Sequence, residues 1–158
     1  MAEVDPDVVF FGDWDELLAW LNWLASGGYL HTLEKELEKI GLQVRGMVRG
    51  HIVKQDLGWK PLADLTVSKK GHAVAYIETG KYLSNIRVRT TTARKESSVF
   101  IYPYGKYSTG AAVDKVAFDL EMGTSTIPSR PLWRPVAEEM LNMDEMMNFP
   151  IEEILGLK

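Results

Sequence analysis

The segment from Phe118 to Pro135, with the sequence FDLEMGTSTIPSRPLWRP, constrains the path of the backbone more than any other part of the chain. Gly123 can adopt a positive φ at low cost, so a strand can turn there. Pro128, Pro131 and Pro135 fix φ and lack a backbone donor, which places them at the start of a helix and not inside it. We therefore predict a short strand, a glycine turn and then a helix. A segment that fixes its backbone this firmly without an evident reactive group is typical of a protein that joins other proteins.

Length and composition limit the classes of protein that remain. The 158 residues suit one domain with a substantial core, and we expect an arm at residues 1–12, a single domain at 13–141 and a tail at 142–158. The chain has no cysteine, which excludes disulfides, zinc–thiolate sites and thiol nucleophiles. No apolar run approaches the roughly 20 residues that a membrane span needs, and the acidic N-terminus lacks the basic start of a signal peptide. We expect no membrane partner.

Charge is distributed unevenly along the chain, whose formal net charge is −4. Residues 1–16 hold six acids and no base, and residues 135–158 hold six acids and one base. Residues 39–118 hold fourteen bases and five acids, a net charge of +9. A solvated mixed surface produces such a pattern. Pairing between copies produces it too, if an acidic end of one copy meets the basic body of the next. The sequence leaves both interpretations open.

The first helix is expected at residues 14–24. Asp13 and Glu16 have the spacing of a capping box, and the apolar residues that follow cover nearly the whole circumference of a helix. Such a helix must be buried on most sides. General burial habits favour the domain's own core, and the alternative is an interface anchored by Trp20 and Trp23.

A second, longer helix is predicted from Leu30 to Val53, because apolar residues recur there at three- and four-residue steps. Gly41, Gly46 and Gly50 within it let another backbone approach closely, and the domain's own sheet is the favoured neighbour. A loop with a short helical turn should follow.

The period of the pattern changes to two in the segment IRVRTTTARK, residues 86–95. One face of this strand is apolar and the other is basic through Arg87 and Arg89, with Arg94 and Lys95 near the tip of a hairpin. The return strand alternates aromatic and aliphatic residues. Its aromatics either stack on bases while the cations contact nucleic acid, or belong to the core.

Nothing in the sequence favours catalysis. Neither the GxSxG nor the HExxH pattern is present, and the three histidines are scattered. Asp119 and Glu121 lie two apart in the strand predicted through Phe118, Leu120 and Met122, which places them on one face as solvent-exposed or interface acids. We therefore expect a protein that is not an enzyme and binds no cofactor or metal ion.

Four segments of the chain stand in a characteristic order. They are LEKELEKIGLQVRGMVRGHI (33–52), WKPLADLTVSKKG (59–71), TGKYLSNIRVR (79–89) and FDLEMGTSTIPSRPLWRP (118–135). In order and spacing they resemble segments of the phage virion-morphogenesis and tail-component proteins, which complete or terminate tails and join them to heads. Asn85 stands where that family usually has serine, and Ser129 stands where it commonly has alanine.

The resemblance implies an α+β fold in which long N-terminal helices pack on a small, mostly antiparallel sheet, with a C-terminal helix. It implies a structural protein of the virion neck, assembled in the host cytoplasm as a homo-oligomeric ring, commonly a hexamer. Its partners are then head–tail adaptor or connector proteins and tail tube or sheath proteins. Genomic DNA passes through such a ring. The basic strand would line the passage, with salt-sensitive attraction to phosphate, or contact a neighbouring copy.

This hypothesis implies a set of interface residues, since Trp and Arg are favoured as anchors. The predicted set is Arg130, Trp133, Arg134, Glu121, Trp20 and Trp23. For Trp133 the alternative is a core residue that seats the last helix. For the whole chain the alternative is a basic nucleic-acid-binding or regulatory module, which the charge of the body suggests.

Overall fold

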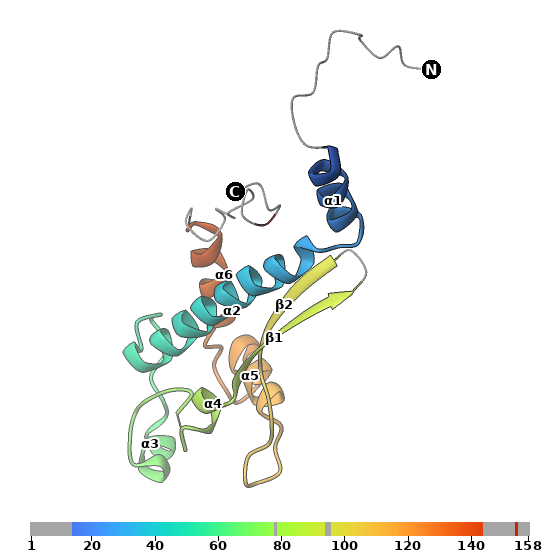
Figure 1. Cartoon of the computed structure of the whole chain (residues 1–158). Coiled ribbons are helices and arrows are strands. Elements are labelled where there is room, and N and C mark those ends of the chain that lie inside the picture. Colours follow the sequence, from blue (N-terminus) through green and yellow to red (C-terminus); the bar gives the residue numbers. More distant parts are fainter. Residues whose placement is uncertain (1–13, 78, 94–95, 144–153, 155–158) are drawn as a thin grey trace.

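The computed structural model describes residues 14–77, 79–93, 96–143 and 154. A long helix packs on a two-stranded antiparallel sheet and a further helix lies toward the C-terminus, so the predicted α+β class is confirmed (Figure 1). The elements are α1 (Trp14–Ala25), α2 (Tyr29–Lys54), α3 (Asp64–Lys70), α4 (Lys81–Ser84), β1 (Ile86–Ala93), β2 (Glu96–Pro103), α5 (Val113–Met122) and α6 (Trp133–Leu141). The predicted arm, Arg94, Lys95 and nearly all of the predicted tail lie outside the described residues.

Helix α2 is the element on which the rest of the chain is assembled (Figure 1). Val44, Val48 and Ile52 recur at four-residue steps, so they share one face, and all three are buried. At Gly41 a Cβ atom would come within 2.5 Å of Val88 Cγ1 in β1, so only glycine lets the sheet lie this close. The predicted approach of the domain's own sheet is confirmed at Gly41 and is wrong for Gly46 and Gly50, where nothing lies within 4 Å of such a Cβ.

Strands β1 and β2 form a hairpin whose two faces differ. The register places Arg87 opposite Tyr102 and Arg89 opposite Phe100, and these four side chains share one face, which we call the outer face. The other face packs against α2. Two strands alone are marginally stable, so the hairpin depends on α2 for its support.

The strand predicted through residues 118–122 is wrong, because these residues belong to α5. The buried residues of α5 are Val113 and Ala117, which lie four apart as a helix requires. Phe118, at the start of the supposed strand, is 65% exposed. The alternation of apolar residues near the end of α5 is a short pattern, and the helical period of the longer segment outweighs it.

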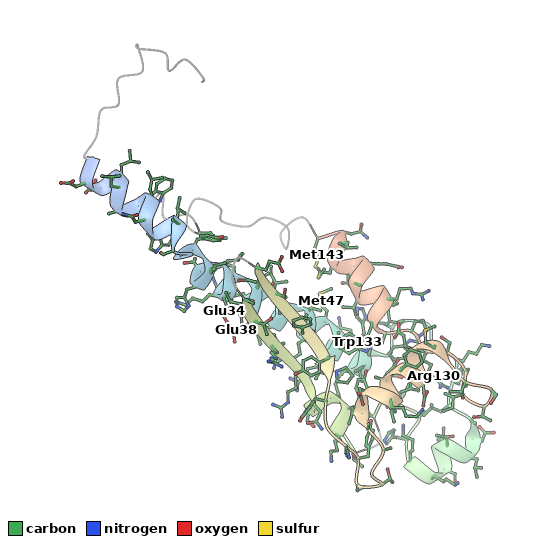
Figure 2. All side chains as sticks on the ribbon, turned by 90° about the vertical axis from the view of Figure 1, so that its right-hand side faces the viewer. Glu34, Glu38, Met47, Arg130, Trp133 and Met143 are labelled. Carbon is green, nitrogen blue, oxygen red and sulfur yellow. The ribbon has the colours of Figure 1, made fainter. Side chains whose placement is uncertain are left out.

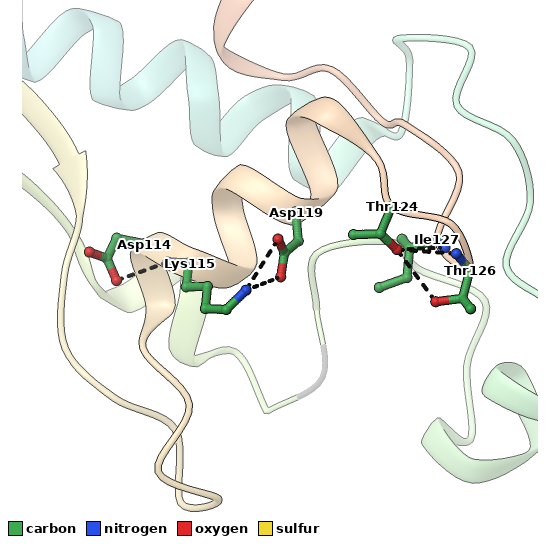
Figure 3. Close-up of polar contacts among 6 residues, drawn as sticks. All are labelled: Asp114, Lys115, Asp119, Thr124, Thr126 and Ile127. Carbon is green, nitrogen blue, oxygen red and sulfur yellow. Dashed lines mark hydrogen bonds and ion pairs between the residues drawn. The ribbon is translucent and has the colours of Figure 1, made fainter.

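The helix separates the two acids that the strand would have placed on one face. Asp119 pairs with Lys115 one turn earlier, at 3.1 Å from carboxylate to ammonium (Figure 3). Glu121 instead points toward the start of α6. The prediction that these two acids share a surface is therefore wrong.

The hydrophobic core lies between α2, α5, α6 and the segment that precedes β1. Val113, Leu132 and Val136 are at most 1% exposed in it. No side chain of α1 that the structure describes belongs to this core, and Leu18 and Leu21 are 54% and 46% exposed. The interpretation of α1 as a core helix is therefore wrong for the single chain. Among the described helices, none is both long and apolar enough to cross a membrane.

Candidate functional site

Segments distant in the sequence meet at one place, which we call the junction. It comprises residues 59–61, Tyr76, Tyr82, Glu121 and residues 129–134. The described polar side-chain atoms that are buried all have hydrogen-bond partners. The hydrogen bonds of the junction therefore hold the segments that meet there in fixed positions.

Arg130 is the buried centre of the junction, with 3% of its surface exposed (Figure 2). Its Nε donates to the carbonyl of Lys60 at 3.0 Å and its Nη2 to the carbonyl of Pro61 at 3.1 Å. Its own carbonyl accepts the hydroxyl of Tyr76. The prediction of Arg130 as an interface anchor is wrong for this chain, because its guanidinium is committed to internal carbonyls. No local pattern could reveal those partners, which lie 70 and 69 residues away.

Aromatic side chains surround this arginine. The ring of Tyr76 lies 5.0 Å from that of Trp59 and 5.1 Å from that of Tyr82. Trp59 Nε1 donates to the carbonyl of Pro131 at 2.6 Å. Burial raises the pKa of Tyr76 and of Tyr82 well above the ordinary value, so both hydroxyls stay protonated. Tyr76 also has a positive φ of 62°, which is uncommon for a large side chain and indicates that the surroundings determine its backbone.

Trp133 is half-buried against the core, and its Nε1 donates to the hydroxyl of Tyr82 at 3.1 Å (Figure 2). Its alternative role, a residue that seats the last helix, matches this placement. Of Arg130, Trp133 and Arg134, only Arg134 is exposed.

Glu121 caps helix α6 from a distance. Its Oε2 accepts the backbone N–H groups of Leu132 at 2.7 Å and Trp133 at 3.0 Å, and its Oε1 accepts that of Arg134 at 3.1 Å. Pro135 has no N–H to satisfy. One carboxylate thus pairs the free donors at a helix start, where negative charge is also favoured. Glu121 was predicted at an interface, and in the single chain its carboxylate accepts these three internal hydrogen bonds.

The turn between α5 and the junction is closed by its own hydrogen bonds. Gly123 has a φ of 79°, and a Cβ there would come 2.8 Å from the backbone nitrogen of Ser129. Thr124 Oγ1 accepts from the backbone nitrogens of Thr126 at 3.3 Å and Ile127 at 3.0 Å (Figure 3). The predicted glycine turn is confirmed, although it follows a helix.

A histidine links α2 to α6 beside the junction. His51 Nδ1 lies 2.6 Å from Asp56 Oδ1, and its Nε2 lies 2.8 Å from Glu139 Oε2. Burial opposes a charge on this ring, but the hydrogen bonds to the two carboxylates outweigh it and raise the pKa of His51 above its ordinary value. In the part of the chain that the structure describes, no group of three or more acids and histidines could hold a metal ion.

The outer face of the hairpin is uncovered. Arg87 and Arg89 are exposed, and Phe100 is 53% exposed, so the interpretation of the aromatics as core residues is wrong for Phe100. A hollow of about 740 Å³ lies on this side of the hairpin. Its lining residues are Arg89, Thr91, Val99, Phe100, Ile101 and Tyr102. The structure therefore places Arg87 and Arg89, two of the predicted contact residues, beside aromatic rings.

Helix α1 is the second uncovered surface, and it lies beyond the tip of the hairpin (Figure 1). Trp20 and Trp23 are half-buried. The indole of Trp23 lies so close to Gly28 that a Cβ there would come 2.0 Å from Nε1, and Ser26 Oγ donates to the carbonyl of Trp23 at 2.8 Å. Trp23 thus fixes the corner between α1 and α2, and the leucines remain outside.

Comparisons with protein-family models, with curated proteins and with solved structures find no match to this chain.

Proposed function

We propose that this chain is a structural subunit of a phage neck, which completes or terminates the tail and joins it to the head connector as part of a homo-oligomeric ring. The observation that supports it is the pairing of a rigid junction with uncovered apolar and basic surfaces. The work of such a subunit is binding, through shape and charge.

The segments that resemble the tail-component proteins also support this proposal by where they lie. Trp59, Tyr82 and Arg130 come from three different segments of that resemblance, and all three hydrogen-bond within the junction. A ring subunit must keep a defined shape, and these residues fix the shape of the chain at the junction. The proposed ring is a homohexamer in the virion. Its partners are adaptor or connector proteins on one side and tail tube or sheath proteins on the other.

The surfaces left for these partners are α1, the outer face and the side chain of Arg134. Phe100 and Leu18 each expose about half of their surface, and exposed apolar groups rimmed by polar residues are typical of sites for protein contact. Arg87 and Arg89 would face either a neighbouring copy or the genomic DNA in the ring.

The proposal is tested in the virus that encodes the chain. Particles assembled without it should be separate heads and tails in electron micrographs, and purified wild-type virions should contain it by mass spectrometry. The wild-type gene supplied in trans should restore joined particles, and a gene encoding Phe100→Asp should restore fewer of them. Normal yields of joined virions without the chain would contradict the proposal.

A second candidate function is binding of nucleic acid, which the cross-strand pairs of arginine with aromatic residues favour. Such a surface binds single strands by stacking and by phosphate attraction. Fluorescence anisotropy with a labelled oligonucleotide at low and high salt distinguishes the two functions. A nucleic-acid-binding module should bind with a steep salt dependence that Arg87→Ala and Arg89→Ala reduce. A neck subunit should show little affinity in free solution.

A further inference from the structure

Helix α1 and the outer face are two uncovered surfaces of opposite charge. Leu18 and Leu21 are neighbours on the helix surface and are 54% and 46% exposed. Asp15 and Glu16 make the first turn acidic, and none of the 12 residues of α1 is basic. The outer face has the reverse character, because two arginines accompany the exposed ring of Phe100.

The outer face is long enough to hold the whole of α1. The 12 residues of α1 span about 18 Å, and the strands of the hairpin, with 8 residues each, span about 27 Å. Glu96 lies at the tip, opposite Ala93, and Arg87 lies near the base. Opposite charges attract, so the acidic first turn of a docked helix can pair with Arg87 at the base.

The hairpin of the same chain is not the partner that this geometry favours. The corner between α1 and α2 is held by the contact of Trp23 with Gly28 and by the hydrogen bond from Ser26. Backbone bonds from Gly27 to Leu24 at 3.0 Å and from Gly28 to Trp23 at 2.9 Å close it further. To reach its own outer face, α1 would have to break this corner and turn around the tip of the hairpin, which it lies beyond (Figure 1).

We propose that α1 of one copy packs on the outer face of a second copy, with Leu18 and Leu21 against Phe100 and the hollow beside it, and Asp15 near Arg87. This inference rests on the proposed function, since it names the contact that would join subunits of the ring. The two surfaces are different, so the contact is heterologous. Successive copies then close into a ring if the rotation between them allows it.

Cross-linking tests the contact directly, because the natural chain contains no cysteine. One sample carries Leu18→Cys and another carries Phe100→Cys, and the two are mixed and oxidised. Disulfide-linked dimers of one copy of each variant should form in high yield. Phe118→Cys is the matched control, because this residue is 65% exposed but lies on α5. Mixed with Leu18→Cys, it should give only background dimer, and equal yields in the two mixtures would overturn the proposal.

Exchange of the charges provides a second test. One variant combines Arg87→Glu with Arg89→Glu, and the other combines Asp15→Lys with Glu16→Lys. Each alone should lose self-association in sedimentation velocity, because like charges face each other. The two mixed together should regain it, since each contact between one variant and the other joins opposite charges. Lys69→Glu combined with Lys106→Glu makes a matched change of charge elsewhere and should associate as the wild type does.

Circular dichroism of every variant shows whether α1 and the body remain folded, and the cysteine pair stays informative if the lysine variant loses helix. A wild-type chain that is monomeric up to its solubility limit would overturn the proposal. So would protection of α1 from hydrogen exchange in a monomer, or hairpin variants that lose only nucleic-acid binding.

The two proposals fail separately. A chain that passes both tests but is absent from virions leaves this contact standing and removes the neck function. A chain that is present in virions but fails both tests leaves the neck function standing and removes this contact.

Discussion

The junction and the outer face contain the same kinds of side chain and use them in opposite ways. Arg130 is 3% exposed and donates to two backbone carbonyls, whereas Arg89 is exposed and lies opposite the exposed ring of Phe100. Trp133 likewise donates its indole N–H to Tyr82 inside the chain. Residue type therefore says little about which arginine or tryptophan binds a partner. The groups that surround the residue decide this. In this chain the buried arginine of the junction bonds within the chain, whereas the arginines of the outer face are exposed.

The largest expected difference between the two regions comes from one substitution made in each. Arg130→Ala leaves the carbonyls of Lys60 and Pro61 without their charged donor, so it should lower the free energy of unfolding by about 3 kcal/mol. Arg89→Ala, its matched control on the outer face, should change it by less than about 0.5 kcal/mol. Urea denaturation measures both. Equal losses would show that the two regions do not differ in this way.

A smaller loss of stability is expected at Gly123. Comparison with Gly110 distinguishes the steric contact at Gly123 from the strain of its positive φ. Gly123→Ala should lower the stability by about 2 kcal/mol, because it adds a clash to the strain of a positive φ. Gly110 has a φ of 86° with open space around it, so Gly110→Ala should lower stability by about 1 kcal/mol from strain alone. Thermal unfolding gives the difference. If the two variants have the same melting temperature, the close approach of Ser129 to Gly123 does not add to the loss of stability.

The cap of Glu121 on α6 should contribute less to the stability than the glycine at position 123 does. Glu121→Gln removes the negative charge from three backbone donors and should lower stability by about 1 kcal/mol. Hydrogen exchange at the amides of residues 132–134 should become faster. Glu138→Gln, at an exposed position of the same helix, is the control and should leave both measurements unchanged. Unaltered exchange in Glu121→Gln would remove the cap as the reason for the start of α6.

The smallest effect is a dependence on pH. The pKa of His51 is raised above 6.5, so its contribution is fully present below that pH and is lost as pH rises through the folded pKa. The hydrogen bond from His51 lowers the pKa of Asp56 below 3.8, so that contribution is present above this pH and is lost as pH falls through the folded pKa.

Both contributions of this histidine cluster are therefore present together between pH 3.8 and 6.5. The stability of the wild type relative to His51→Gln should be greatest in that window and decline on either side of it. Denaturation across pH measures the difference, with His72→Gln as the control. A difference that does not vary with pH would show that the two carboxylates do not favour the charged ring.

The local elements of this fold could largely be predicted from the sequence. The apolar stripe of α2 and the period-two pattern of β1 give those elements nearly at their bounds, because each pattern is long enough to exclude other periods. The second half of helix α5 was predicted as a strand, because Phe118, Leu120 and Met122 alternate with polar residues there.

The roles of the candidate site residues could be predicted only in part. The basic face of Arg87 and Arg89 follows from alternation alone, and the register then places them beside aromatic rings. The roles of Arg130 and Glu121 depend on partners far along the chain, such as the carbonyl of Lys60, that only the folded chain brings near. Short-range patterns carry no information about such contacts.

The close contact at Gly41 has a mechanical consequence. No flexible side chain separates the backbone of α2 from Val88 and Val99 there, because a Cβ would come within 2.7 Å of each valine. A load applied to the hairpin therefore passes into the long helix through direct contact with its backbone. Any side chain at this position would hold the sheet and the long helix farther apart.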